Sequence, residues 1–460
     1  MLKRKIETKL DFWYNNRKQA LLVTGARQVG KTHSIEHFIK KRFQSVIEID
    51  FSKRTDLLDI FARLDNSNDL LVRLSLIAGK MMIPNKTVFF LDEIQLVYQR
   101  REEMVANGLI SSTSQDIITA MKDMVQKGEY RFILSGSLLG ILIKDVNLNP
   151  VGYLDEYKMY PLDFEEYLWA KGVGDDAIEY IKNCFINKVP VEDEINKMLL
   201  NYFREYVIVG GMPESVESYI SKNNLYLVQE TQNQIVNRYK KDITTYVKDD
   251  AMKLRIRDIF SAIPSQLSNK NARYISSNVL DKQYLKHNKV HDEFLWLSAA
   301  GVAIPTYHVN EPVVPLTLSV ERKTMKLFSN DIGLLVSQLV DTDIRIKLLN
   351  DEKVINYGAP YENVAAQELI AHGFDEELYY FNSKQHGEVD FLVTLNNDVL
   401  PIEIKSGKTP DSQIYDHAAL NNLINTYKYP LAYVFGNSNV IKENETIYQL
   451  PIYMIDFIRK

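Results

Sequence analysis

The sequence predicts an α/β protein whose first part is a parallel β-sheet with helices on both faces. Apolar or alternating runs at 21–23, 45–51 and 88–91 have the length and pattern of strands. A further strand is expected at 130–137, after a helix at 115–127. Repeated strand–helix units of this kind favour a parallel sheet whose ligand lies at the carboxyl ends of the strands.

A helix is also expected at 3–18, before the first strand. Its residues Arg4, Trp13 and Arg17 either border a nucleotide base or belong to a surface helix with one aromatic anchor. We favour the surface helix, because a single buried aromatic side chain is enough to anchor it.

A glycine-rich turn follows the first strand and fits the pattern G-x-x-x-x-G-K-[ST]. In this turn successive backbone N–H groups point at the ligand, and the following helix adds a positive dipole, so phosphate groups are held largely by the main chain. Lys31 is placed to reach the β- and γ-phosphates of ATP, and the Thr32 hydroxyl to ligate Mg²⁺. A glycine-containing turn that binds nothing is the alternative. The residues predicted to bind the nucleotide here are Gly25, Ala26, Arg27, Gln28, Val29, Gly30, Lys31, Thr32 and His33.

Two carboxylates end the third predicted strand. Asp92 and Glu93 are costly at the tip of a buried strand without a cation nearby, and Mg²⁺ bound to phosphate would supply the charge. We expect Asp92 to belong to the Mg²⁺ shell and Glu93 to polarise the attacking water, with Lys31 as the second catalytic residue. Ser135 or Ser137, at the end of the next strand, either contacts the γ-phosphate or is a turn residue.

Composition and charge are ordinary for a globular protein. Charged residues make up 25% and hydrophobic residues 45% of 460 residues, enough for two to four domains. The net charge of −5 excludes a global basic field, although a local basic groove remains compatible with it. Cys184 is the single cysteine, so neither an intramolecular disulfide nor a cysteine-cluster metal site can form. With no secretion signal at the start and no membrane-spanning apolar run, we expect a cytoplasmic protein without membrane contact.

Motifs spread over nearly the whole chain carry a family resemblance. They are GARQVGKT (25–32), FFLDEIQ (89–95), SGSLLG (135–140), MYPLDFEEYLWA (159–170), YVIVGGMPESV (206–216), IVNRYKKDI (235–243), IPSQLS (263–268), AAGVAIPTYHV (299–309) and YENVAAQEL (361–369). Together they resemble AAA-type ATPases of bacteria and archaea that carry an uncharacterised C-terminal nuclease-like region. One departure is Val151-Gly152-Tyr153, where an arginine is expected after the glycine, so no γ-phosphate contact is carried over from this position.

The pattern and the resemblance divide the chain into four parts. These are a P-loop ATPase domain (1–165), a helical lid (166–248), a winged-helix-like domain (249–345) and a restriction-endonuclease-like α/β domain (346–460). In the lid, Arg238 and Lys241 either serve the γ-phosphate of a neighbouring subunit or are solvated surface residues, and we favour the second. In the third part, helices expected at 254–269, 271–280 and 289–303 and a β-ribbon after them outline a winged helix. Its basic residues fit DNA while interleaved acids fit a protein contact, and we favour DNA.

The last constellation combines Glu362 on a helix with Asp390, Glu403 and Lys405 on two successive strands. Side chains alternate along a strand, so Glu403 and Lys405 share a face, and Asp390 on the neighbouring strand can share a divalent cation with Glu403. The arrangement resembles the PD-(D/E)xK restriction-endonuclease fold, with Glu362 as the helix-borne acid that some members add. An amphipathic edge strand is the alternative, and such a domain can cleave nucleic acid, bind DNA ends or be silent.

Three functional hypotheses follow. The first is a Mg²⁺-dependent ATPase whose nucleotide cycle drives a C-terminal nucleic-acid-handling module. The second is a metal-dependent nuclease regulated by ATP, and the third is a non-enzymatic scaffold or sensor gated by nucleotide. ATP is the expected small-molecule partner and DNA the favoured macromolecule, while a homo-oligomer and a monomer both fit.

Overall fold

The computed structural model describes residues 2–79, 82–111, 113–137, 152–247, 249–268, 290–350, 358–406 and 415–460. Their contacts form two compact units. The N-terminal unit comprises Lys3–Tyr160 with Ala299–Gly301, and the C-terminal unit comprises Pro161–Ser298 with Val302–Lys460 and the first two residues. The finer division predicted at 248 and 345 stays a prediction.

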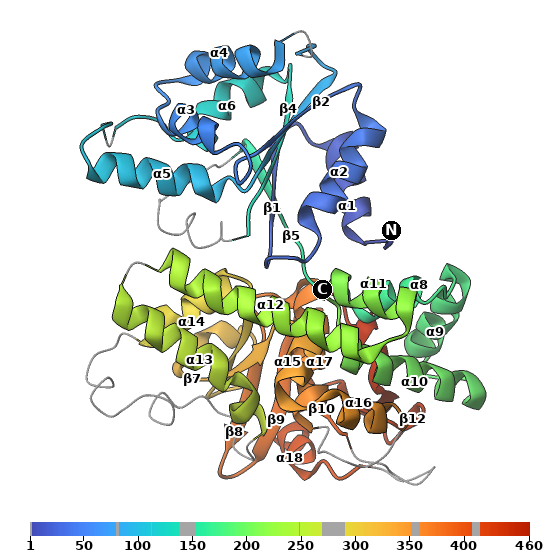
Figure 1. Cartoon of the computed structure of the whole chain (residues 1–460). Helices are drawn as coiled ribbons and strands as arrows, with labels where there is room; N and C mark the ends of the chain where they lie inside the picture. Colours follow the sequence, from blue (N-terminus) through green and yellow to red (C-terminus); the bar gives the residue numbers. More distant parts are fainter. Residues whose placement is uncertain are drawn as a thin grey trace. The chain divides into compact units, whose positions relative to one another are not determined.

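Five parallel strands form the sheet of the N-terminal unit, in the order β2-β3-β4-β1-β5 (Figure 1). The strands are β1 (Ala20–Thr24), β2 (Ser45–Asp50), β3 (Thr87–Asp92), β4 (Arg131–Ser135) and β5 (Leu154–Lys158). Every residue of β1 and β3 is buried, since both strands lie inside the sheet. The α/β class predicted from the sequence is therefore confirmed.

Helices cover both faces of this sheet, as predicted. Figure 1 shows α1 and α2 on one face and α3, α4 and α6 on the other. The helices are α1 (Ile6–Asn16), α2 (Lys31–Arg42), α3 (Leu58–Ala62), α4 (Ser67–Ala78), α5 (Gln95–Ala106) and α6 (Ile117–Lys127), with the short 3₁₀ turn η1 (Thr55–Leu57) before α3. Trp13 is fully buried and anchors α1, so the prediction of a surface helix with one aromatic anchor is confirmed.

The elements β5 and α5 were not predicted from the sequence. The strand β5 is at the edge of the sheet and its residues are only partly buried, so it lacks the apolar run that reveals a strand. The helix α5 is rich in arginine, glutamine and glutamate, and its few buried residues do not form a continuous apolar stripe. Neither element has a clear apolar pattern in its sequence, because each is stabilised by its neighbours in the folded unit.

The first part of the C-terminal unit is helical, as predicted for 160–245. The helices of the unit are α8 (Phe164–Ala170), α9 (Asp175–Asn187), α10 (Asp193–Val209), α11 (Pro213–Lys222), α12 (Leu225–Tyr246), α13 (Asp250–Ser268), α14 (Val290–Ala299), α15 (Ile332–Leu339), α16 (Thr342–Leu349), α17 (Gly358–Leu369) and α18 (Ala418–Tyr427). In the part of the chain that the structure describes, no helix combines the length and the apolar character needed to cross a bilayer.

The break between α10 and α11 has a steric cause. Gly210 has φ +74°, and a Cβ atom at that position would lie 2.4 Å from the Asp331 carboxylate. The backbone N–H of Gly211 donates to the same carboxylate at 2.6 Å. Glycine is needed at 210 because the backbone turns and approaches Asp331 closely.

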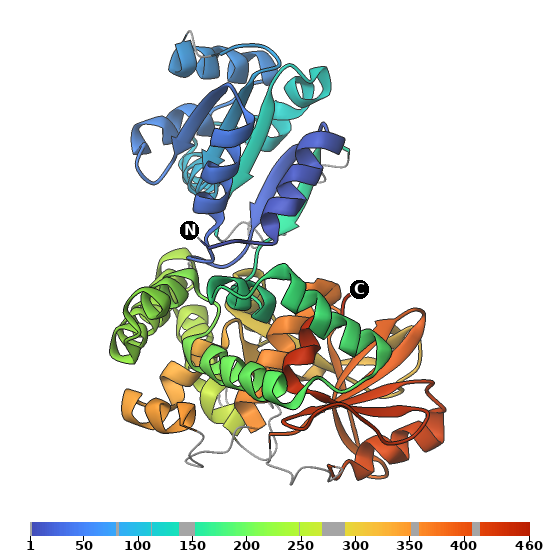
Figure 2. The ribbon, with the colours of Figure 1, turned by 90° about the vertical axis from the view of Figure 1, so that its right-hand side faces the viewer.

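An eight-stranded mixed sheet forms the rest of the C-terminal unit, in the order β12-β13-β11-β10-β9-β8-β6-β7. Figure 2 shows this twisted layer, with α18 packed against one face near β9. The strands are β6 (Ala303–Val309), β7 (Val320–Ser329), β8 (Tyr379–Ser383), β9 (Gly387–Leu395), β10 (Asp398–Ile404), β11 (Ala432–Gly436), β12 (Ile441–Lys442) and β13 (Ile447–Pro451). Short turns complete the unit, namely η5 (Leu316–Ser319), η6 (Ile370–Phe374) and η7 (Ile452–Phe457).

The β-ribbon predicted after the helices of 249–345 exists as β6 and β7. Its strand β6 pairs in parallel with β8, so the ribbon is the edge of the C-terminal sheet. This pairing gives no support to a separate winged helix, and the helix expected over 271–280 is outside the described residues. Sequence pattern identifies a strand but not its partner, which is the reason for the difference.

Candidate functional site

The glycine-rich turn adopts the backbone that its sequence predicts. Three of its residues have left-handed φ angles, namely Gly25 (135°), Gln28 (67°) and Gly30 (95°). A Cβ atom on Gly25 would lie 2.1 Å from the backbone oxygen of Met159, so a side chain is excluded there. Gly30 caps the N-terminus of α2, which brings the positive end of the helix dipole to the turn.

The ammonium of Lys31 lies inside this turn. Its Nζ donates to the backbone oxygens of Gly25 at 2.9 Å and Ala26 at 2.8 Å. Burial lowers the pKa of Lys31 to about 8, against the attraction of Glu93 and Asp92. The Lys31 ammonium lies where a phosphate group would bind. A bound anion there would favour the protonated form of Lys31.

The carboxylate of Asp92 connects the ends of β3 and β4 with the first turn of α2. Thr32 Oγ1 donates to Asp92 Oδ2 at 2.7 Å, Ser135 Oγ donates to Oδ1, and the backbone N–H of Glu93 donates to Oδ1 at 3.0 Å. The order β3-β4-β1 produces this meeting, because parallel neighbours end at the same edge of the sheet. A hydroxyl and a carboxylate in direct contact form an oxygen donor pair that suits Mg²⁺.

Glu93 follows β3 in a tight turn with φ 54°. Its Oε2 accepts a hydrogen bond from Ser137 Oγ at 3.4 Å and another from Gln95 Nε2. The sequence analysis did not assign Gln95 a role, although it belongs to the motif FFLDEIQ. Its position could have indicated a role in the site, because it is two residues after Glu93 and at the start of α5.

The remaining predicted turn residues contribute in different ways. The side chains of Ala26 and Val29 are buried, so only their backbone groups can serve a ligand. Arg27 and Gln28 are partly exposed, and His33 is exposed on the first turn of α2. These residues stay predicted ligands of the nucleotide.

Arg4 supports the turn from outside, a role that the sequence analysis missed. Its Nη1 donates to the backbone oxygen of Val29 at 2.8 Å and its Nη2 to that of Tyr160 at 2.7 Å. Arg4 is buried, so the two charge-assisted bonds tie α1 to the turn and to the end of the unit. Arg4 therefore holds backbone groups of the turn, whereas the sequence favoured a surface helix at this position, with contact to a base as the alternative.

The residues predicted at the second site also lie together, in the C-terminal unit. Strands β9 and β10 form a hairpin, and the backbone N–H of Ile404 donates to Asp390 Oδ2 at 2.8 Å. Lys405 Nζ donates to Glu403 Oε1 at 2.9 Å. Glu403 Oε2 is buried and has no hydrogen-bond partner among the residues described.

A buried lysine from β7 joins this acidic cluster and was not predicted. Lys326 Nζ is 2.8 Å from Glu388 Oε1, 3.3 Å from Glu362 Oε2 and 3.9 Å from Asp390 Oδ1. Lys326 precedes Glu362 by 36 residues and the other acids by more, so no local spacing in the sequence indicates the contact. Its ammonium already supplies a positive charge to three of the acids.

Burial raises the pKa values of the acids in this cluster. Burial, with the repulsion of Asp390, raises the pKa of Glu403 to about 8, against the attraction of Lys405. Burial also raises the pKa of Glu362 to about 7, although Lys326 opposes the shift. For Lys326 burial opposes the charge, yet the surrounding carboxylates raise its pKa. Glu362 and Glu403 therefore keep their protons to a higher pH than exposed glutamates do.

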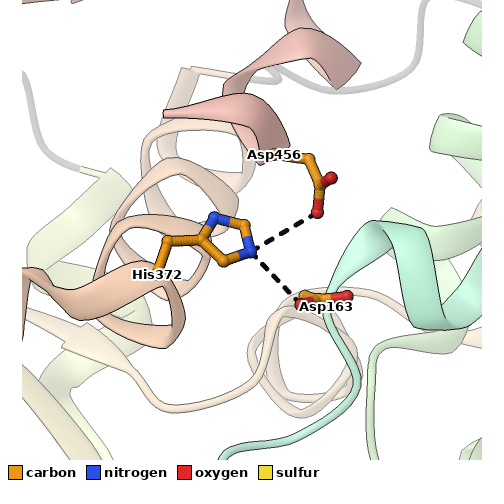
Figure 3. Close-up of side chains that lie close together, drawn as sticks. All are labelled: Asp163, His372 and Asp456. Carbon is orange, nitrogen blue, oxygen red and sulfur yellow. Dashed lines mark hydrogen bonds and ion pairs between the residues drawn. The ribbon is translucent and has the colours of Figure 1, made fainter. Parts of the chain in front are cut away.

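A third cluster joins distant parts of the C-terminal unit (Figure 3). His372 Nε2 lies 3.2 Å from Asp163 Oδ2 and 3.5 Å from Asp456 Oδ1, and the three side chains are buried. Their ligand atoms lie within 4.8 Å of one another. The other oxygens are already engaged, because Asp163 Oδ1 accepts from Glu166 N–H at 2.9 Å and Asp456 Oδ2 accepts from Arg459 at 3.3 Å. We interpret the cluster as a link between α8, η6 and η7.

The other predicted contacts are undecided. Arg238 and Lys241 are exposed on α12, in agreement with the favoured view that they are surface residues. Their role toward a neighbouring subunit stays a prediction. Val151 is outside the described residues, so only Gly152 and Tyr153 of the motif at 151–153 are described.

Comparison with known families assigns the N-terminal part. Residues 17–168 match the model described as an AAA domain. Residues 200–344 and 357–455 match two domains of unknown function, DUF8612 and DUF4143. The C-terminal match names no nuclease, so it gives no support to the nuclease-like interpretation.

Two curated relatives match a shorter stretch. The uncharacterized proteins Mb2031c of Mycobacterium bovis and Rv2008c of Mycobacterium tuberculosis are each 27% identical over 131 residues. The match covers 28% of this chain and 28% of each relative.

Solved structures show a distant likeness. The Walker-type ATPase paby2304 of Pyrococcus abyssi is 15% identical, with 74% of this chain and 96% of that chain covered and a TM-score of 0.41. The ORC2 protein of Aeropyrum pernix is 8% identical, with 74% and 90% covered and a TM-score of 0.35. Residues 17–168 are therefore similar to AAA domains, and the geometry of the glycine-rich turn agrees with that match.

Proposed function

We propose that the N-terminal unit binds ATP with Mg²⁺ and hydrolyses ATP. The observation that carries this proposal is the meeting of Lys31, Thr32 and Asp92 at the carboxyl ends of β1 and β3, with Glu93 beside them. The donors fit a nucleotide, since the left-handed turn presents backbone N–H groups, Lys31 is cationic, and Thr32 with Asp92 offers oxygens.

Each residue has a distinct task in this mechanism. The backbone of the turn and Lys31 bind the β- and γ-phosphates, and Thr32 and Asp92 hold Mg²⁺, which neutralises charge on the phosphate oxygens when bound. Glu93 takes the proton of the attacking water. The water oxygen then bonds to the γ-phosphorus, the bond from that phosphorus to the β–γ bridging oxygen breaks, and ADP leaves with the electron pair.

Two substitutions test this assignment. Lys31→Ala removes a charge-assisted contact to phosphate and is expected to weaken ATP binding about 100-fold. Glu93→Gln keeps binding and is expected to lower the turnover rate by at least about 100-fold. Binding of a fluorescent ATP analogue and phosphate release measure the two effects.

Matched controls come from α2 and α5. Lys40→Ala on α2 removes an exposed lysine that pairs only with Glu36, and Glu103→Gln on α5 removes an exposed carboxylate that pairs with Arg100. Both controls are expected to behave as the unchanged protein does. Normal turnover in Glu93→Gln would remove Glu93 from the mechanism.

The acidic cluster of the C-terminal unit favours a second candidate function. We propose that it binds a divalent cation through Asp390 and Glu403 and acts on nucleic acid under the control of the ATPase site. The support is Glu403 Oε2, which is buried beside a second carboxylate without a hydrogen-bond partner in the described chain. A cation there would relieve the repulsion, whereas Lys326 already serves Glu362 and Glu388.

Incubation with DNA or RNA separates the candidates. We expect cleavage in the presence of Mg²⁺ or Mn²⁺. It should depend on ATP and be lost in Asp390→Ala. Cleavage that persists in Asp390→Ala counts against this site. Slow ATP turnover with nucleotide-dependent oligomerisation and no cleavage would instead favour a nucleotide-gated scaffold.

A further inference from the structure

Gln95 makes its one side-chain hydrogen bond, within the described chain, to Glu93. It is the first residue of α5, is 0% exposed, and donates from Nε2 to Glu93 Oε2. A carboxylate only accepts hydrogen bonds, so the amide must present its NH₂ group to Glu93. The contact therefore fixes which way the amide faces.

The other end of the same amide has no partner. Gln95 Oε1 is buried and accepts no hydrogen bond from the residues that the structure describes. A buried carbonyl without a donor lowers stability, so an apolar side chain of similar size would suit the fold better at this position. A polar residue that is unfavourable for folding and touches a site residue indicates a role in the site.

The backbone before Gln95 is also held in an uncommon conformation. Glu93 has φ 54°, a left-handed angle that a glutamate adopts only where its surroundings impose it. Two bonds impose it here, from Glu93 N–H to Asp92 Oδ1 at 3.0 Å and from Ile94 N–H to the Ser135 backbone oxygen at 3.1 Å. The turn fixes the Cα of Glu93 and leaves its carboxylate to be oriented by side chains.

We infer that Gln95 is a positioning residue for Glu93: its amide holds Oε2, so that Oε1 accepts the proton of the attacking water. No described residue donates a hydrogen bond to Oε1, whereas Oε2 has Gln95 and the longer contact from Ser137. This inference rests on the proposed hydrolysis. Without the amide the carboxylate rotates among several rotamers, and fewer encounters place it against the water.

The first test is Gln95→Leu in the full chain. The turnover rate is expected to fall about 10- to 100-fold, because a small misplacement of a catalytic group has effects of that size. The KM for ATP and the Kd of a fluorescent ATP analogue are expected to stay within about threefold. The thermal midpoint is expected to stay equal or rise, since the unmatched carbonyl is gone.

A second variant and a matched control keep the test decisive. Gln95→Glu preserves the shape but removes the donor, and it is expected to lose turnover in the same way, so it decides the matter if Gln95→Leu does not fold. Gln99→Leu changes the same residue type one helical turn further along α5, where no hydrogen bond to Glu93 is made, and it is expected to have no effect.

Two results would overturn the inference. One is turnover within about threefold of the unchanged protein in both Gln95 variants. The other is a loss of turnover accompanied by equal losses of ATP affinity and thermal stability, which would report damage to the fold. Glu93→Gln is measured in parallel: normal turnover there refutes the hydrolytic role of Glu93, whereas an inactive Glu93→Gln with active Gln95 variants refutes only the positioning role.

Discussion

Replacement of Glu403 by glutamine should make stability of the C-terminal unit less dependent on pH. Burial and the charge of Asp390 raise the pKa of Glu403 from 4.5 to about 8 in the folded chain. Between these values the unfolded chain releases the proton while the folded chain keeps it. The free energy of unfolding therefore falls as pH rises, by about 1.4 kcal/mol per pH unit.

The magnitude follows from that interval. A shift of this size corresponds to roughly 5 kcal/mol between the two pH limits, as an upper value, since neighbouring groups respond to the change. Glutamine resembles the protonated carboxyl and does not titrate. Glu403→Gln is therefore expected to match the unchanged protein near pH 4.5 and to be more stable by a few kcal/mol near pH 8.

Urea unfolding at about pH 5 and about pH 8, without divalent ions, measures the difference. Hydrogen exchange of the β10 amides assigns the transition to the C-terminal unit. Glu445→Gln is the control, because Glu445 is an exposed carboxylate that contacts only Lys442. A stability difference between Glu403→Gln and the unchanged protein that is the same at both pH values would refute the reasoning.

Two further substitutions test contacts that the sequence did not reveal. Arg4→Ala leaves the backbone oxygens of Val29 and Tyr160 without donors and is expected to cost about 1–3 kcal/mol of stability and to raise the KM for ATP. Unchanged thermal unfolding and KM in this variant would show that the turn does not depend on Arg4. His372→Ala leaves two buried carboxylates close together and is expected to cost about 3 kcal/mol, whereas His372→Gln, which keeps an N–H donor, should lose less. Equal urea midpoints for both His372 variants would contradict this account.

Much of the N-terminal site could be predicted because its signals are local. The turn from Gly25 to Thr32 needs particular φ angles and a following helix, and both requirements are written in adjacent residues. Asp92 is the last residue of a buried strand and Glu93 follows it, which marks them as strand-end acids. The contacts of Arg4 could not be predicted, since Arg4 is 25 residues before Val29 and an arginine near a helix start has many ordinary uses.

The C-terminal cluster shows the opposite case. The spacing of Asp390, Glu403 and Lys405 predicted a hairpin, and β9 and β10 form it. Lys326 changes the charge of that cluster, yet it comes from β7, on a strand that periodicity could not place beside α17. Its contribution depends on long-range packing.

The sequence by itself determined the phosphate-binding turn, the strand-end acids and the alternation of strands and helices, because each is encoded over a few neighbouring residues. The tertiary structure alone decided which strands are neighbours. It placed Lys326 among buried acids, and it joined β6 and β7 to the C-terminal sheet. These contacts join segments whose proximity follows from the burial of the whole core, which no local pattern contains.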